Sequence, residues 1–138
     1  MNVFLPMVEA RRIYSWNNVT YLRDTGHRLQ VVTKQHFDSQ NDYIGSEQYQ
    51  DTLDLIRSRS ILLNDYMTSE RLYVNPDNIL FLSNPVYDSY EFVEIMMHPV
   101  EKDGTEYRIR VVESLEQIQE LITACYLGLP FKTHLLKA

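Results

Sequence analysis

Apolar and polar residues alternate most clearly between positions 92 and 112, and this pattern predicts an antiparallel pair of strands. The strands cover residues 92–98 and 105–112, and Lys102-Asp103-Gly104 forms the turn between them. Alternation places one set of side chains on the core face: Val93, Ile95, Met97, Tyr107, Ile109 and Val111. The opposite face carries Phe92, Glu94, Met96, Arg108 and Arg110. Glu94 then lies across from or diagonal to Arg108, within reach of a cross-strand ion pair.

Strand patterns also occur upstream of this pair. Residues 19–22 and 29–33 are rich in β-branched and aromatic side chains and predict a hairpin with a turn at Gly26. Residues 72–74 and 79–82 are apolar at nearly every position, which is typical of strands covered on both faces. The four residues between them, Asn75-Pro76-Asp77-Asn78, have the composition of a tight turn.

Helical spacing appears in two places. After Gly45-Ser46, apolar residues recur at Tyr49, Leu53 and Ile56, and Ser46 is expected to cap the first turn. The second helix begins with a capping box of Ser114 and Gln117. Its apolar stripe comprises Leu115, Ile118, Leu121, Ile122 and Cys125, and Pro130 prevents its continuation.

These elements predict an α+β fold in a single domain of 138 residues. We expect an antiparallel sheet of four to six strands, with the two main helices packed on its one apolar face. Residues 1–18 fit either a short strand or an arm that docks elsewhere. We find no internal repeat.

Composition narrows the possible partners. A net charge of -6 argues against binding to bulk nucleic acid or to an anionic membrane surface. No segment approaches about 18 consecutive apolar residues, and the first residues lack the basic and apolar regions of a leader. The single cysteine, Cys125, fits a reducing compartment, so we expect a cytoplasmic protein.

The motifs of common enzymes are missing from the sequence. There is no phosphate loop, dinucleotide fingerprint, nucleophile elbow or helical His-Glu-x-x-His. The four histidines are widely separated, and Cys125 falls on the apolar stripe of a helix, where a thiol is inert. We therefore expect no catalytic residues, no metal site and no cofactor, although a carboxylate-based enzyme that cleaves a nucleotide stays an alternative.

A set of arginine and aromatic residues suits the binding of a planar, phosphate-bearing ligand. The candidate ligand-binding residues are Tyr14, Trp16, Arg57, Phe81, Phe92, Arg108 and Arg110. In this hypothesis Phe81 stacks on the base, Arg108 and Arg110 hold phosphates, and Arg57 reaches in from the first helix. The alternative is purely structural: Phe81 is a core residue, Tyr14 and Trp16 pack the N-terminal arm, and Arg108 pairs with Glu94.

Two resemblances to known families follow from these residues. The run Tyr73-Val74-Asn75-Pro76-Asp77-Asn78-Ile79, followed later by Val112-Glu113-Ser114-Leu115-Glu116, resembles the small flagellar regulatory proteins of the FlbD type. That resemblance covers the C-terminal half and implies a protein-interaction module of flagellar assembly. The layout of the whole chain resembles phage proteins that counter the Thoeris defence by sequestering a cyclic ADP-ribose signal.

The second resemblance implies a non-catalytic, homo-oligomeric protein that binds a small anionic nucleotide in the host cytoplasm. We take sequestration of a nucleotide-derived signal as the leading hypothesis. A protein-interaction module of the FlbD type is the alternative.

Overall fold

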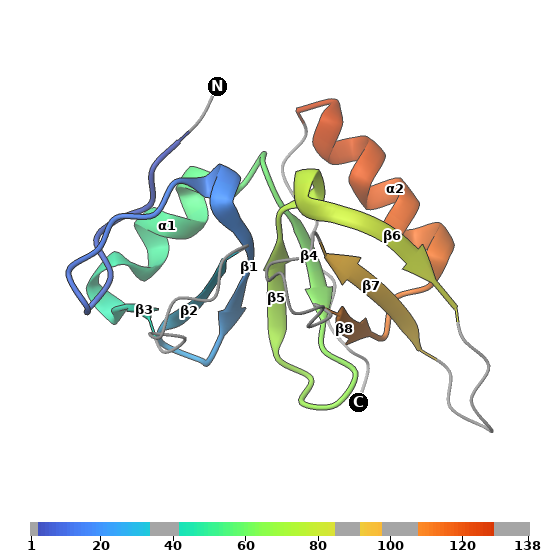
Figure 1. Cartoon of the computed structure of the whole chain (residues 1–138), viewed down its shortest axis with the longest axis horizontal. Coiled ribbons are helices and arrows are strands. Elements are labelled where there is room, and N and C mark those ends of the chain that lie inside the picture. Colours follow the sequence, from blue (N-terminus) through green and yellow to red (C-terminus); the bar gives the residue numbers. More distant parts are fainter. Residues whose placement is uncertain (1–2, 34–41, 85–91, 98–107, 129–138) are drawn as a thin grey trace, which may run out of the picture.

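The computed structural model describes residues 3–33, 42–84, 92–97 and 108–128. These residues form two antiparallel sheets (Figure 1). The five-stranded sheet has the order β3-β2-β1-β5-β4, with β1 (Val19–Asp24), β2 (Leu29–Thr33), β3 (Tyr43–Ile44), β4 (Ile61–Asn64) and β5 (Arg71–Val74). The three-stranded sheet has the order β6-β7-β8, with β6 (Ile79–Ser83), β7 (Val93–Met97) and β8 (Arg108–Val111).

Two α-helices and three short 3-10 turns complete the described fold. The helices are α1 (Tyr49–Ile56) and α2 (Leu115–Tyr126). The 3-10 turns are η1 (Trp16–Asn18), η2 (Ser46–Gln48) and η3 (Pro76–Asn78). The predicted α+β class is confirmed, whereas the expectation of one sheet with both helices on one face is wrong.

The predicted single sheet is divided into two because the turn between β5 and β6 does not reverse the chain into a hairpin. The Asn75 side chain accepts a hydrogen bond from the amide of Asp77 (3.1 Å), which stabilises η3. Its Nδ2 donates to the carbonyl of Trp16 (2.8 Å), and Nδ2 of Asn78 donates to that of Val19 (2.7 Å). These bonds hold η3 against the first sheet while the chain passes from β5 into the second sheet.

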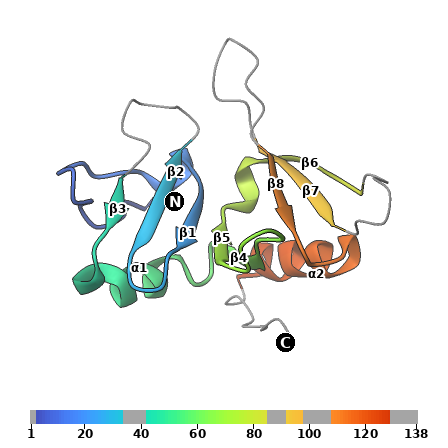
Figure 2. The ribbon, with the colours of Figure 1, turned by 90° about the horizontal axis from the view of Figure 1, so that it is seen from below.

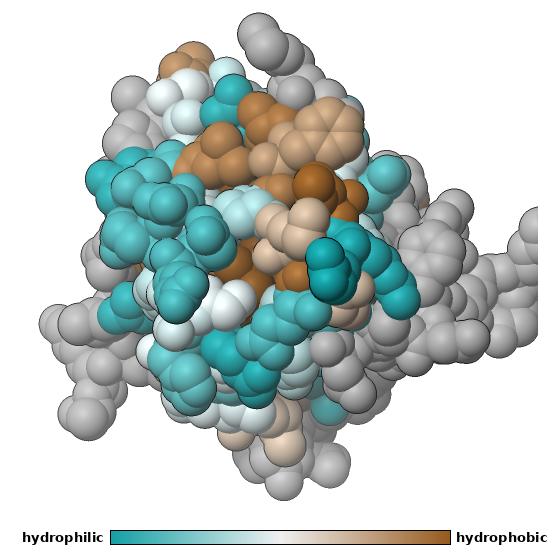
Figure 3. All heavy atoms as spheres, turned by 90° about the vertical axis from the view of Figure 1, so that its left-hand side faces the viewer, coloured by the Kyte–Doolittle hydropathy of each residue, from teal (hydrophilic) through white to brown (hydrophobic). Residues whose placement is uncertain are grey.

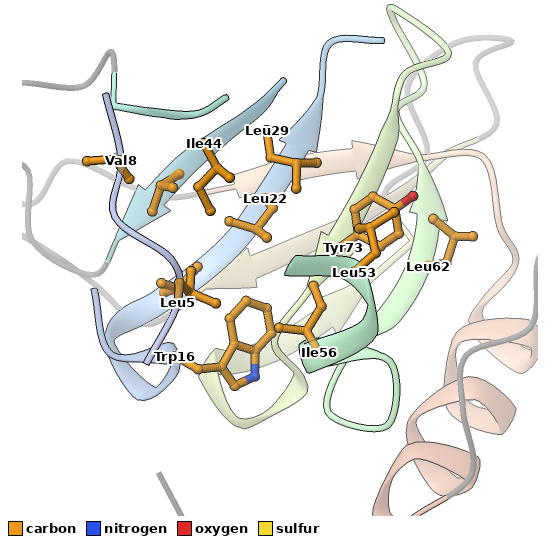
Figure 4. Close-up of a cluster of buried hydrophobic side chains, with 12 residues drawn as sticks. Leu5, Val8, Trp16, Leu22, Leu29, Ile44, Leu53, Ile56, Leu62 and Tyr73 are labelled. Carbon is orange, nitrogen blue, oxygen red and sulfur yellow. The ribbon is translucent and has the colours of Figure 1, made fainter. Parts of the chain in front are cut away.

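The buried apolar residues form two hydrophobic clusters, one on each face of the five-stranded sheet, and the three-stranded sheet covers the second. The first contains Leu5, Val8, Trp16, Val19, Leu22, Leu29, Val31, Ile44, Leu53, Ile56, Leu62 and Tyr73, and α1 closes it (Figure 4). The second contains Tyr21, Ile61, Leu63, Leu72, Val74, Val93, Ile95, Met97, Ile109, Val111, Ile118 and Cys125, and α2 closes it. Side chains of β4 and β5 alternate between the two clusters, so these strands are covered on both faces.

Both predicted hairpins form with the expected faces. Strands β1 and β2 are joined by a turn in which Gly26 has a φ of 109°, a conformation that favours glycine. In the second hairpin Val93 pairs with Val111, and the predicted core residues of β7 and β8 are buried. The predicted turn at 102–104 and Tyr107 lie outside the described residues.

The two helix starts turn out differently. The capping box of α2 is present, since Ser114 Oγ accepts from the Gln117 amide (3.1 Å) and Gln117 Oε1 accepts from the Ser114 amide (2.8 Å). Ser46 was expected to cap the first helix, but it starts the turn η2 and makes no capping bond at the start of α1. The prediction for Ser46 is therefore wrong, because α1 begins three residues later.

The described chain repeats one order of elements. A hairpin, a 3-10 turn, three antiparallel strands and a helix follow one another in residues 3–56, here called the N-terminal unit, and again in residues 61–126, the C-terminal unit. Figure 2 shows the two units side by side, with β5 of the C-terminal unit next to β1 of the N-terminal unit. No internal repeat was found in the sequence, but the order of structural elements repeats.

Details of the backbone support the equivalence of the two units. The strands after η1 and η3 each have a register shift at the second residue, at Thr20 in β1 and at Leu80 in β6. The hairpin that opens each unit has a residue with positive φ in its turn, Arg11 (65°) and Ser69 (61°). In each unit the hairpin also bonds to the third strand, through Glu9 N to Tyr43 O (2.8 Å) and Tyr66 N to Arg110 O (2.8 Å).

The N-terminal arm is the hairpin of the first unit. Phe4 and Ser15 form an antiparallel bridge, and the Leu5 amide donates to the Tyr14 carbonyl (2.9 Å). Leu5 and Val8 are buried in the first cluster, which fixes this N-terminal hairpin (residues 3–15) on α1 and the sheet. Both readings of the arm therefore hold in part, because it pairs with itself and docks on the core.

Candidate functional site

Four of the seven predicted ligand-binding residues lie together on the face of the three-stranded sheet that points away from α2, here called the outer face. Strand pairing places Phe81 opposite Met96, and Met96 opposite Arg108. Arg110 lies one pleat further along β8, and Phe92 directly precedes β7. The alternation of β7 and β8 that the sequence predicted is what brings these side chains to one face.

Glu94 organises the charge of the outer face. Its carboxylate is buried and accepts from Nη1 of Arg108 (3.3 Å) and from Nε of Arg110 (3.2 Å). It lies opposite Arg110 and diagonal to Arg108, so the predicted ion pair with Arg108 is confirmed. Two guanidinium groups thus contact the same carboxylate.

Arg110 is held in place by an aromatic pair beneath it. Its guanidinium carbon lies 4.8 Å from the centroid of the Phe92 ring, and that ring lies 5.2 Å from the ring of Tyr66. Phe92 is buried, so its ring supports the arginine and is not exposed to a flat ligand. Phe81, by contrast, is 49% exposed and presents its ring to solvent.

The other three predicted residues lie in the N-terminal unit, away from the outer face. Trp16 is a buried core residue whose Nε1 donates to the Arg59 carbonyl (3.2 Å) (Figure 4). Tyr14 donates its hydroxyl hydrogen to Asp42, and burial together with this bond raises the pKa of Tyr14. Arg57 is exposed at the end of α1 and pairs with Asp54 (3.2 Å). The structure does not bring these residues to Phe81, Arg108 and Arg110.

A second polar cluster, which the sequence did not indicate, lies where the two units meet. Arg23 on β1 donates to Asp65 (2.9 Å) and Glu70 (3.0 Å) in the turn of the β4–β5 hairpin. Burial alone would raise the pKa of Asp65, but the amides of Met67 (2.8 Å) and Thr68 (3.1 Å), together with Arg23, lower it below its ordinary value. No spacing in the sequence links Arg23 to a turn more than 40 residues away, so this cluster could only be found in the fold.

A concave space of about 420 Å³ lies beside this cluster and is lined by Asp24, Thr25, Gly26, Tyr49, Glu70 and Arg71. Asp24 is buried and uses both oxygens, accepting from the Gly26 amide (2.8 Å) and from the Tyr49 hydroxyl. Burial and the bond to Asp24 raise the pKa of Tyr49. The carboxylate is thus satisfied by its own fold and leaves no unpaired oxygen for chemistry in this space.

A further hollow of about 350 Å³ lies where η1, η3 and the ends of both helices meet. Cys125 lines it, with its Sγ 3.8 Å from the Ser58 carbonyl, and burial raises the pKa of the thiol. Tyr126 donates to Asp77 (2.9 Å) at the rim, and burial with this bond raises the pKa of Tyr126 to about 12. Cys125 is therefore a protonated, buried thiol, as predicted from its place on the helix.

Within the described ranges, no three side chains of His, Cys, Asp or Glu lie close enough together to hold a metal ion. The same ranges contain no helix that is long and apolar enough to cross a membrane. No family model, curated protein or solved structure matches the chain. The assignment of a function therefore rests on the geometry of the outer face.

Proposed function

We propose that the protein is a non-catalytic binding protein whose outer face holds a small, planar, anionic ligand. The observation that supports the proposal is the combination, on one sheet face, of the exposed ring of Phe81 with two arginines that both contact Glu94. An exposed aromatic ring can stack on a base, and guanidinium groups can bind phosphate oxygens.

The distances across the sheet suit such a ligand. Phe81 and Arg108 are separated by one intervening strand, which corresponds to about 10 Å at the usual strand spacing. A base stacked on Phe81 leaves its ribose over Met96 and its phosphates at the arginines. Stacking contributes about 1–3 kcal/mol per base, and hydrogen bonds to charged groups contribute about 1.5–3 kcal/mol each.

The finer proposal concerns the ligand and its purpose. We propose a nucleotide-derived signal of the cyclic ADP-ribose type, held intact and so removed from an anti-phage defence in the host cytoplasm. The supports for this step are the resemblance of the chain layout to phage proteins of that kind and the lack of an enzyme motif in the sequence.

Isothermal titration calorimetry tests the proposal with cyclic ADP-ribose isomers, linear ADP-ribose and cyclic dinucleotides as probes. We expect heat of binding for at least one of them, and an affinity that falls about 10-fold or more in Arg110→Ala. Arg57→Ala is the matched control, because Arg57 is also exposed and paired with a carboxylate but directly follows α1 in the N-terminal unit. No heat with any probe, from folded protein, would contradict the proposal.

Recovery of the ligand separates sequestration from catalysis. The complex is denatured after prolonged incubation, and the released nucleotide is identified by mass spectrometry. Intact ligand is expected; a cleaved product would make the protein an enzyme and overturn the non-catalytic assignment.

A second candidate function has one observation in its favour. Strand β6 lies at the edge of its sheet among the described residues, and Leu80 and Phe81 on it are about half exposed. Exposed sheet edges can bind protein segments by strand addition, which would suit a protein-interaction module such as the FlbD-type alternative. A pull-down that returns flagellar components, unchanged by Arg108→Ala, would favour this candidate over nucleotide binding.

A further inference from the structure

Strand β6 and its equivalent in the N-terminal unit, β1, differ in their neighbours. Strand β1 pairs with β2 on one side and with β5 on the other, whereas β6 pairs in the described part of the chain only with β7. The exposed fraction follows this difference. Thr20 and Tyr21 on β1 are 0% and 9% exposed, and Leu80 and Phe81 at the same positions on β6 are 50% and 49% exposed.

The strand that covers β1 comes from the other unit. Strand β5 belongs to the hairpin that opens the C-terminal unit, and it pairs antiparallel with Tyr21, Leu22 and Arg23 of β1. The Asn75 amide extends the pairing to the Thr20 carbonyl (2.9 Å). Within one chain, the hairpin of the C-terminal unit thus covers the edge of β1 in the N-terminal unit.

The hairpin equivalent to β4–β5 is the N-terminal hairpin, and its outer side carries exposed apolar residues. Counting back from the 3-10 turns, Ile13 takes the place of Tyr73 and Tyr14 that of Val74. Tyr73 is buried in the first cluster, while Ile13 is 55% exposed. Phe4 and Met7 are also more than half exposed. Figure 3, which faces the side with this hairpin and α1, shows apolar residues gathered in its upper part with polar residues around them.

We propose that the edge of β6 in one copy of the chain binds the N-terminal hairpin of a second copy, in the way that β1 binds β5. The strand before η1 in the second copy then adds to β6 as a fourth, antiparallel strand. Leu80 and Phe81 become covered, and Ile13 of the second copy packs toward the partly buried Leu82. Each copy has one acceptor edge and one donor hairpin, so the contact is head-to-tail and builds a closed ring or a filament.

One consequence links this interface to the ligand, and it rests on the proposed function. Counting back from η1, Tyr14 of the second copy lies opposite Phe81, so the interface adds an aromatic residue next to the proposed stacking surface. The interface itself is measured without ligand, and its failure is therefore distinguishable from the failure of nucleotide binding.

Sedimentation velocity on the full chain over a range of concentrations, without any ligand, tests the interface. The wild type is expected to associate with increasing concentration. Leu80→Asp places a charge on the acceptor edge and Ile13→Asp places one on the donor hairpin; each alone is expected to be monomeric. Met67→Asp is the matched control, since Met67 is 74% exposed in another turn, and it should associate like the wild type.

Mixing the two blocked variants makes the test specific for a head-to-tail contact. Leu80→Asp retains an intact hairpin and Ile13→Asp an intact edge, so an equimolar mixture should form a dimer and nothing larger. Circular dichroism checks that each variant is folded. As a second readout on unmodified protein, hydrogen exchange of peptides spanning 79–83 should slow as the concentration rises.

Three results would overturn the inference. The first is a wild type that stays monomeric up to its solubility limit with no concentration dependence of exchange at β6. The second is association of Ile13→Asp alone, which would mean that β6 pairs with a second β6. The third is association that begins only when residues 129–138 are removed, which would assign the edge to this chain's own C-terminal segment.

Discussion

The two units have the same order of elements, and their equivalent strands β1 and β6 show how neighbouring strands determine the burial of a strand. Both strands follow a 3-10 turn, both have a register shift at the second residue, and both have an aromatic residue at the third position and leucine at the fourth. Strand β1 is buried because the other unit adds β5 to it, whereas β6 keeps two large apolar side chains half exposed. The comparison teaches that the burial of a strand depends on what pairs with it as well as on its own residues.

The two units also differ in the position of an arginine that packs on an aromatic ring. In the N-terminal unit the guanidinium of Arg28 lies 4.1 Å from the centroid of Tyr43, and in the C-terminal unit that of Arg110 lies 4.8 Å from Phe92. The cation and the ring have exchanged strands between the two units. As a result, the C-terminal unit has its cation on the third strand beside Arg108, with Glu94 between them. The arginine pair is therefore a feature of one unit and not of the repeated fold.

The largest effect is expected from truncating the equivalent leucines of the two strands. Leu22→Ala removes a fully buried side chain from the first cluster and should lower the free energy of unfolding by about 2–5 kcal/mol. Leu82 is only partly buried, so Leu82→Ala should cost about 1–2 kcal/mol in dilute protein. Urea denaturation monitored by circular dichroism measures both. Equal costs in dilute protein would show that β6 is as well covered as β1.

A smaller effect is expected at the last residues of the equivalent turns η1 and η3. Asn78 is buried and its Nδ2 bonds the carbonyls of Asn17 (3.1 Å) and Val19 (2.7 Å). Asn78→Ala leaves both acceptors without this donor and should cost about 2–3 kcal/mol in urea denaturation. Asn18, its equivalent, is exposed, so Asn18→Ala should change stability by less than about 0.5 kcal/mol. A large loss of stability in Asn18→Ala would contradict this difference between the two turns.

The local elements were predictable from the sequence because their signals are local. Alternation identified β7 and β8 with their core faces, and the Ser114 capping box identified the start of α2. The same alternation placed Phe92, Arg108 and Arg110 on one face, and strand pairing in the structure brings Phe81 to that face as well.

The repeat and the split into two sheets were not predictable, for physical reasons. From Ser15 to Arg23 and from Asn75 to Ser83, only Asn18/Asn78 and Leu22/Leu82 are identical, so the repeat survives in hydrogen bonding and not in side chains. Likewise Trp16 looks like a ligand wall next to arginines in the sequence, and only the packing of α1 shows that it is core. Among the described residues no strand pairs with the outer edge of β6, and an apolar run in the sequence cannot reveal this cause of the exposure of Phe81.

The pH dependence of stability tests how the two units are joined at Asp65. Because hydrogen bonds and Arg23 lower the pKa of Asp65 below 3.8, its ionised form stabilises the folded state above that pH, and this contribution is lost as the pH falls through the folded pKa. Asp65→Asn should therefore cost about 1–2 kcal/mol at neutral pH, and the difference from the wild type should shrink below about pH 4.

Urea midpoints between pH 3 and pH 7 measure this difference, and Asp54→Asn serves as the control. Asp54 is exposed and paired with Arg57 within one helix, so removing its charge should have little effect at any pH in this range. A cost for Asp65→Asn that is constant with pH would show that shape at this turn matters and the charge does not.

The smallest effect concerns the two helix starts, which occupy the same place in their units but are built differently. Ser114 makes a reciprocal capping box with Gln117, whereas Ser46 makes no capping bond and lies exposed in η2. Ser114→Ala should lower the free energy of unfolding by about 1 kcal/mol, and Ser46→Ala should change it by at most a few tenths. Thermal and urea unfolding of the pair measure the contrast. If both substitutions cost the same, α1 begins at Ser46 in solution and the two units are more alike than their caps in the structure indicate.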